Sequence, residues 1–93
     1  MSSPTQNKII ISLHDEPKCA SDIALDLDIR FPNISTNLRK MTDEKIVVHE
    51  RKGIRKKYQL TSSGNQMYDF LSQHDKDFKE LVEAYAFEKE RRQ

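Results

Sequence analysis

The sequence predicts a mainly helical α+β fold, with three short helices, a two-stranded β-hairpin and a long C-terminal helix. Apolar residues recur at helical spacing in the first 41 residues and again in the last third of the chain. Between Ile46 and Leu60, β-branched and aromatic residues alternate on either side of one glycine, as they do in a hairpin. A chain of 93 residues allows one domain with one modest core. We therefore assign residues 1–93 to a single domain, with the first helices and the hairpin at 4–60 and the final helix at 61–91.

The composition argues against several classes of protein. Hydrophobic residues make up 35% of the chain and charged residues 33%, and no apolar run approaches the roughly 18 residues that a membrane span requires. The N-terminal MSSPTQNK lacks the apolar segment of a signal peptide, and the single cysteine cannot form a disulfide within the chain. We therefore expect a cytoplasmic protein without a membrane partner.

The first helix has a recognisable start and stop. Ser3 is the expected N-cap, Pro4 stands in the first turn and Gln6 follows at the capping-box position. Pro17 cannot continue a helix, so this one should end near residues 14–15. Its apolar stripe consists of Ile9, Ile10 and Leu13.

A short extended piece around Lys18 and Cys19 separates the first helix from the second. The second helix has its N-cap at Cys19 or Ser21. Its buried face consists of Ile23, Ala24 and Leu27.

The third helix should begin at Pro32, after a turn, and run to about Thr42. Its inward face consists of Ile34, Leu38 and Met41, at spacing i, i+4 and i+7. Two helices of this length joined by a short turn form a helix-turn-helix motif, whose second helix reads DNA. The side chains on its other faces can bond to base edges or phosphates, although any surface helix has a polar face. These candidate residues are Asn33, Ser35, Thr36, Asn37, Arg39 and Lys40, with Arg30 just before the helix as a phosphate contact.

The hairpin has an unusually basic tip. Two β-rich runs, residues 46–51 and 55–60, flank Lys52-Gly53-Ile54, and Gly53 permits the positive φ of a tight reversal. Such a concentration of like charges is disfavoured unless a polyanion lies nearby. The basic residues are Arg51, Lys52, Arg55, Lys56 and Lys57.

Charge is divided unevenly along the chain. Residues 30–57 contain nine lysines and arginines against three acidic residues, a local net charge of +6 within a total of +1. Attraction to phosphate depends on local charge density, so this division favours binding to nucleic acid. A solvated, purely surface role for the charges is the alternative.

Beyond Gly64 the chain has no proline or glycine, and a heptad-like stripe predicts one helix over residues 62–91. Such a helix would be roughly 45 Å long, more than a small core can cover. We therefore expect it to pack against the same helix of a second subunit. The alternative is a break near residues 72–77 that folds the end of the chain back over its own domain. The expected dimer contacts are Met67, Leu71, His74, Phe78, Leu81, Val82 and Tyr85.

Catalytic and metal-binding motifs are missing from the sequence. The three histidines are dispersed, and there is no paired cysteine or histidine at metal-ligand spacing and no glycine-rich phosphate loop. We expect neither an enzyme nor a cofactor. Cys19 is either a buried small residue or, in a dimer from a hyperthermophile, one half of a disulfide between subunits.

The order of these elements resembles the winged-helix regulators, in particular the MarR-like, PadR-like and ArsR-like groups with their small archaeal and viral members. The resemblance covers residues 5–72 and lies in CASDIALDLDI, in ISTNLRKM followed by DEKIVVHERKG, and in KKYQLTSSG. It implies that the helix at 32–41 enters the major groove and that the hairpin is the wing. Lys45 departs from the pattern, because many members have a glycine there, and so does Phe31-Pro32 at the start of the third helix.

The function expected from these observations is that of a homodimeric transcriptional regulator that binds double-stranded DNA selectively. Its two recognition helices would lie roughly 34 Å apart, one turn of B-DNA. The alternative is a protein-interaction adaptor, in which the wing contacts an acidic partner and the last helix joins a coiled coil. The sequence does not identify an effector ligand, an operator or the direction of regulation.

Overall fold

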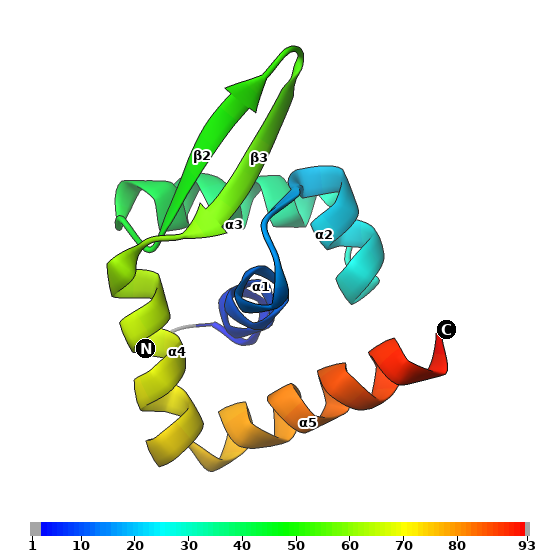
Figure 1. Ribbon diagram of the computed structural model, residues 1–93, viewed down its shortest axis with the longest axis vertical. Coiled ribbons are helices and arrows are strands. Elements are labelled where there is room, and N and C mark those ends of the chain that lie inside the picture. Colours follow the sequence, from blue (N-terminus) through cyan, green and yellow to red (C-terminus); the bar gives the residue numbers. More distant parts are fainter. Residues whose placement is uncertain (1–2, 93) are drawn as a thin grey trace.

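The computed structural model describes residues 3–92, in which helices surround a central first helix and a β-hairpin projects from one side (Figure 1). The elements in chain order are α1 (Pro4–Asp15), β1 (Lys18–Cys19), α2 (Ala20–Leu27), α3 (Phe31–Asp43), β2 (Val47–Lys52), β3 (Arg55–Leu60), α4 (Ser62–His74) and α5 (Lys76–Arg91). The mainly helical α+β class and the expected order of elements are confirmed.

Helix α1 lies at the centre of the core and packs against the other four helices (Figure 1). Its start is as expected: the Ser3 side chain accepts a hydrogen bond of 3.1 Å from the backbone N–H of Gln6. Ile9 and Ile10 are completely buried. Because α1 is covered on every side, it also buries Ser12, a polar position that the apolar stripe does not explain.

Helices α2 and α3 form the helix-turn-helix, and both end in a left-handed residue. Asp28 follows α2 with φ 54°, and Lys45 follows the C-cap of α3 with φ 62°. The backbone N–H of Ile46 then donates to the carbonyl of Met41 at 2.9 Å, closing a Schellman turn. This left-handed conformation favours glycine, and Lys45 adopts it with a side chain present.

The predicted two-stranded hairpin is confirmed, and the extended residues before α2 add a third strand to it, which gives an antiparallel sheet with strand order β1-β3-β2. The extended residues before α2 form β1, in which Lys18 pairs with Tyr58 on β3. Strands β2 and β3 pair from Val47 opposite Leu60 to Lys52 opposite Arg55. Strand β1 joins the base of the hairpin to the helices. The tip of the hairpin extends beyond the helices (Figure 1).

The single long helix expected at residues 62–91 is also wrong, because the chain turns at Asp75 between α4 and α5 (Figure 1). Asp75 has an extended backbone and caps both helices: its N–H donates to the carbonyl of Leu71 at 2.9 Å, and its carboxylate accepts from the N–H of Phe78 at 3.1 Å. An aspartate that satisfies both helix ends makes the break favourable. The alternative prediction, a break near residues 72–77 after which the chain folds back over its own domain, is therefore the correct one.

The stripe expected to form the dimer contact instead faces the chain's own core. Phe78 is 0% exposed within one chain, so its prediction as a dimer contact is wrong. Five other residues of the stripe are half-buried against the same core: Met67, Leu71, Leu81, Val82 and Tyr85. Contact between their exposed surface and a second subunit stays a prediction. His74 is exposed on α4, where its ring lies beside that of Phe70. Within residues 3–92, no helix combines the length and the apolar character needed to cross a bilayer.

Candidate nucleic-acid interface

Most of the side chains on α3 that are predicted to bind DNA are exposed to solvent. Its buried face is the one expected, formed by Ile34, Leu38 and Met41. Of the six candidates on the other faces, five are exposed and one, Asn37, is half-buried; the exposed residues are Asn33, Ser35, Thr36, Arg39 and Lys40. Arg30, the N-cap of α3, is exposed as well.

Some of these polar groups are held by the helix itself. The Thr36 hydroxyl donates to the carbonyl of Pro32 at 2.9 Å, and the Asn37 amide donates to the Asn33 side-chain oxygen at 2.8 Å. Arg39 and Lys40 have no side-chain hydrogen bond or ion pair within residues 3–92. Arg39 and Lys40 are therefore unengaged, while Asn33 and Asn37 hold each other in a fixed orientation.

The five basic wing residues are all exposed, and the strand register pairs several of them unfavourably. Arg51 lies directly opposite Lys56, and Lys52 lies opposite Arg55. Like charges at directly opposed strand positions destabilise a hairpin. Only Glu50, opposite Lys57, offers a compensating charge on this hairpin. The free protein therefore carries a repulsion at the tip that a bound polyanion would relieve.

A groove separates the start of α3 from the tip of the hairpin. One side is lined by Phe31 and Ser35 of α3, and the other by Ile54, Arg55 and Lys56 of the hairpin; the lining also includes Ala20, Ser21 and Tyr58. Of the predicted DNA-binding residues, the structure therefore brings Ser35 of α3 together with Arg55 and Lys56 of the wing in this groove. The other candidates on α3 are not among its lining residues. The wing lies beside α3, as Figure 1 also shows.

Cys19 lies in this groove as a free, half-buried thiol at the start of α2. Its sulfur donates to the carboxylate of Asp22 at 3.0 Å, and the guanidinium of Arg55 is 4.0 Å away. A disulfide between two copies of Cys19 stays a prediction, and it would require these grooves to meet. Within residues 3–92, no three histidine, cysteine or acidic side chains gather in a way that could hold a metal ion.

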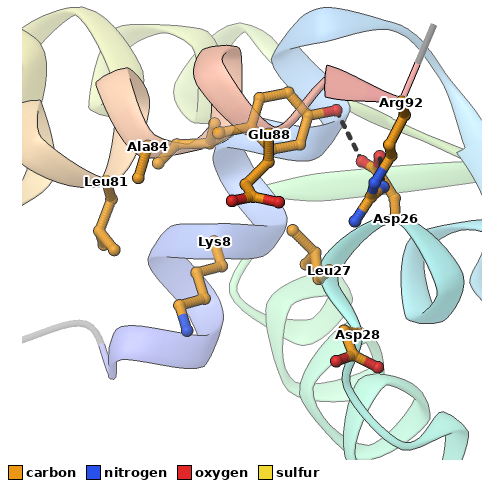
Figure 2. A pocket seen from close by; sticks show the side chains of 10 residues that line it. Lys8, Asp26, Leu27, Asp28, Leu81, Ala84, Glu88 and Arg92 are labelled. Carbon is orange, nitrogen blue, oxygen red and sulfur yellow. Dashed lines mark hydrogen bonds and ion pairs between the residues drawn. The ribbon is translucent and has the colours of Figure 1, made fainter. Parts of the chain in front are cut away.

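A buried polar network joins β1, α1, α2 and α5, and sequence reasoning did not find it. The Lys18 ammonium is 3.0 Å from the Asp26 carboxylate and donates to Ser12 at 3.1 Å and to Tyr85 at 3.3 Å. Tyr85 in turn donates to Asp26 at 2.6 Å, the bond dashed in Figure 2. Lysine is rarely this buried unless it is paired, and Lys18 is only 8% exposed. No periodicity identifies such a residue, because its burial depends on β1 joining the sheet.

The network also shifts two pKa values. Burial alone would raise the pKa of Asp26, but hydrogen bonds from Tyr85, Ser12 and Lys18, with the charge of Lys18, outweigh it and hold the pKa below its ordinary value. Burial, and then the hydrogen bond to Asp26, raise the pKa of Tyr85. Beside the network, a hollow lies between α1, α2 and α5, bordered by Lys8, Leu27 and Leu81 (Figure 2).

Comparison with known proteins identifies the family. A family model described as "Methanogenesis regulatory protein FilR1, N-terminal domain" matches residues 1–73, more than half of the chain. No curated protein sequence matches the chain.

Solved structures of winged-helix regulators share the fold. The transcriptional repressor BigR from Xylella fastidiosa superposes with a TM-score of 0.65 at 20% identity, over 81% of this chain and 79% of that one. A homodimeric winged helix-turn-helix DNA-binding domain of Mb0332 from Mycobacterium bovis, described as a possible ArsR-family regulator, gives 0.63 at 17% identity over 80% and 77%. A ZitR variant from Lactococcus lactis gives 0.70 at 19% identity over 88% of this chain and 65% of that one, so the chain spans less than two thirds of that protein.

The superpositions show that these proteins share a fold, and the family match shows that the sequence is related to the FilR1 N-terminal domain. The resemblance to winged-helix regulators is thereby confirmed. The chain belongs to the family of the N-terminal domain of the methanogenesis regulatory protein FilR1 and has the winged-helix fold of these solved regulators.

Proposed function

We propose that the protein binds double-stranded DNA selectively, with α3 in the major groove and the wing on the adjacent backbone or minor groove. The observation that carries this proposal is the groove between α3 and the hairpin. Its α3 side offers the Ser35 hydroxyl beside the ring of Phe31, and its hairpin side offers the cations of Arg55 and Lys56. A duplex backbone lying in this groove would place base edges beside α3 and phosphates beside the wing.

The two surfaces have different tasks in this proposal. Arg39 and the paired amides of Asn33 and Asn37 read base edges, because arginine matches guanine and asparagine matches adenine. Ser35 and Thr36 add shorter contacts, while Lys40 and Arg30 hold phosphate. The wing residues supply affinity that depends little on sequence.

We further propose that the protein acts as a homodimer, as the Mb0332 domain does. The support within this chain is two aromatic side chains left in solvent on the last two helices: Phe70 is 62% exposed on α4 and Phe87 is 60% exposed on α5. With Phe78 committed to the core, the second subunit would cover these rings and the half-buried stripe beside them. Two copies would present two recognition helices to a pseudo-palindromic site.

A DNA-binding role places the protein where the DNA is, in the cytoplasm of a cell without a nucleus. The family name, which refers to methanogenesis, favours an archaeal source. An adaptor that uses the wing for an acidic protein partner is the competing function, and the experiment below separates the two. No effector is assigned.

The experiment is fluorescence anisotropy of labelled duplex and single-stranded DNA of mixed sequence, titrated with the full chain over a salt series. We expect a preference for duplex and a steep linear fall of log affinity with log salt, because each neutralised phosphate releases counterions. The Arg51→Ala/Lys56→Ala double variant should bind with a shallower slope. Weak binding that does not change with salt would reject the DNA function and favour the adaptor.

A further inference from the structure

Ile54, at the tip of the wing, is 97% exposed and has no structural task within the chain. It follows Gly53 in a two-residue turn between Lys52 and Arg55, which pair across the strands. Gly53 has φ 65°, and Ile54 is not among the residues with positive φ. A glycine with positive φ at the first turn position is the pattern of a type II′ hairpin turn. This turn requires its glycine but makes no demand for an isoleucine after it.

The surroundings of the tip show that the chain does not use the apolar side chain for packing. A Cβ placed on Gly53 would have no atom within 4 Å, so the turn stands in open space. The tip lies away from the helices in Figure 1. Six-residue strands at about 3.3 Å per residue give the hairpin a reach of about 20 Å. A large apolar side chain is thus presented at the end of a long arm, with cations immediately before and after it.

The position of the tip relative to α3 identifies what it would meet on DNA. Ile54 and Arg55 form one wall of the groove whose other wall is Phe31 and Ser35. If α3 occupies the major groove, the sugar-phosphate strand bordering that groove lies between these walls. The far side of this strand is the minor groove. The flanking cations are drawn to its negative potential, which is strongest where the groove is narrow.

We propose that Ile54 is an apolar wedge that enters the minor groove and partly unstacks one base step, which kinks the duplex toward its major groove at that step. Isoleucine is among the side chains that minor-groove proteins use in this way. The proposal rests on the DNA binding proposed above and adds a source of sequence selectivity. Pyrimidine–purine steps such as TA and CA/TG unstack most easily, so the wing would select them without a hydrogen bond to any base.

The first test is selection of bound duplexes from a random pool of about 40 base pairs, followed by sequencing. The wild-type chain should enrich a motif read by α3 and, beside it, a pyrimidine–purine step. Ile54→Ala should keep the α3 motif, lose enrichment of the step, and bind the wild-type-selected duplex about tenfold more weakly. Ile54→Leu retains an apolar wedge and should restore the enrichment. Val48→Ala, which trims an exposed apolar residue of β2 away from the tip, should behave as wild type.

The second test measures the bend directly, by energy transfer between dyes on the two ends of the most enriched duplex. Wild-type protein and Ile54→Leu should shorten the distance between the ends, and Ile54→Ala should do so much less while keeping the same salt slope. If the wild-type protein binds with a steep salt slope but leaves the duplex unbent, the wedge is refuted and the proposed DNA-binding function is not. Equal bending and equal step enrichment with Ile54→Ala would also refute it. A wild-type chain without salt-dependent duplex binding would refute both the wedge and the proposed function.

Discussion

Lys45 occupies a backbone conformation that suits glycine. With φ 62°, its Cβ is crowded by the backbone, at a cost of roughly 1–2 kcal/mol for a residue other than glycine. Lys45→Gly should therefore raise the free energy of unfolding by about 1 kcal/mol, after the greater freedom of glycine in the unfolded chain is subtracted. Urea unfolding followed by circular dichroism measures the change. The matched control is Lys79→Gly, inside α5, which should lower stability by about 1 kcal/mol.

Asp26 makes stability depend on pH in acid. Its pKa is lowered in the folded protein, so it contributes stability that is present above the ordinary pKa of an aspartate and is lost as pH falls through the lower, folded pKa. Wild type should be more stable than Asp26→Asn at neutral pH, and this difference should shrink below about pH 4. Thermal unfolding of both proteins from pH 7 to pH 2 measures it. A difference that is constant with pH would show that the Asp26 charge does not support the network.

In the hairpin, we expect Arg51 to increase DNA affinity while it lowers the stability of the free protein. Arg51 faces Lys56, so Arg51→Glu replaces a repulsive pair by an attractive one and should stabilise the free protein by about 0.2–1 kcal/mol. The same change should weaken binding to every duplex, because the wing loses positive charge. Thermal unfolding without DNA and anisotropy with DNA measure the two effects. A variant that both unfolds earlier and binds normally would contradict this account of the wing.

Helix α3 and the wing should also differ in what they recognise. Arg39→Ala removes a side chain free to bond guanine and should lower discrimination between duplexes by about 1–3 kcal/mol. Lys56→Ala should weaken all duplexes alike and reduce the salt slope by about one. Competition between a selected duplex and a mixed-sequence duplex, measured over a salt series, separates the two. Identical effects of both variants on every duplex would reject the division of tasks.

The elements with strong local signals were predictable from the sequence. Ser3 and Gln6 predicted the start of α1, Pro32 predicted the first turn of α3, and Gly53 predicted the turn of the hairpin. The inward face of α3 followed from its spacing alone. These features depend on residues that are close together in the sequence, so local physics is sufficient to place them.

Features that depend on distant residues were missed. Lys18 becomes a strand residue and a buried cation only because β3 and Asp26, far along the chain, meet it. The break at Asp75 was left as the less favoured alternative because the heptad spacing continues across it without interruption. What decides the break is Phe78 turning into the core, and a periodic stripe cannot reveal whether it faces a partner or its own domain.

The assembly of the whole molecule is testable through its exposed aromatic residues. Phe87→Glu places a charge at the surface proposed for the second subunit and should weaken dimerisation at least tenfold, since aromatic anchors carry much of the energy of interfaces. Sedimentation equilibrium measures the association. The control is Val48→Glu on β2, which is 44% exposed and lies on the hairpin, away from the last two helices, and should leave the dimer intact. A wild-type chain that sediments as a monomer at all concentrations would reject the homodimer.

The complete burial of Phe78 makes α5 part of the hydrophobic core. The family match covers residues 1–73 and stops before α5, yet α5 supplies Phe78 to the core and Tyr85 to the Lys18 network. A fragment cut at residue 73 would leave α1 uncovered along one side and a buried lysine without one of its partners. We therefore expect residues 1–73 alone to be less stable than the chain that includes α5. Fragments prepared for crystallisation or for fusion to other domains should extend through residue 91.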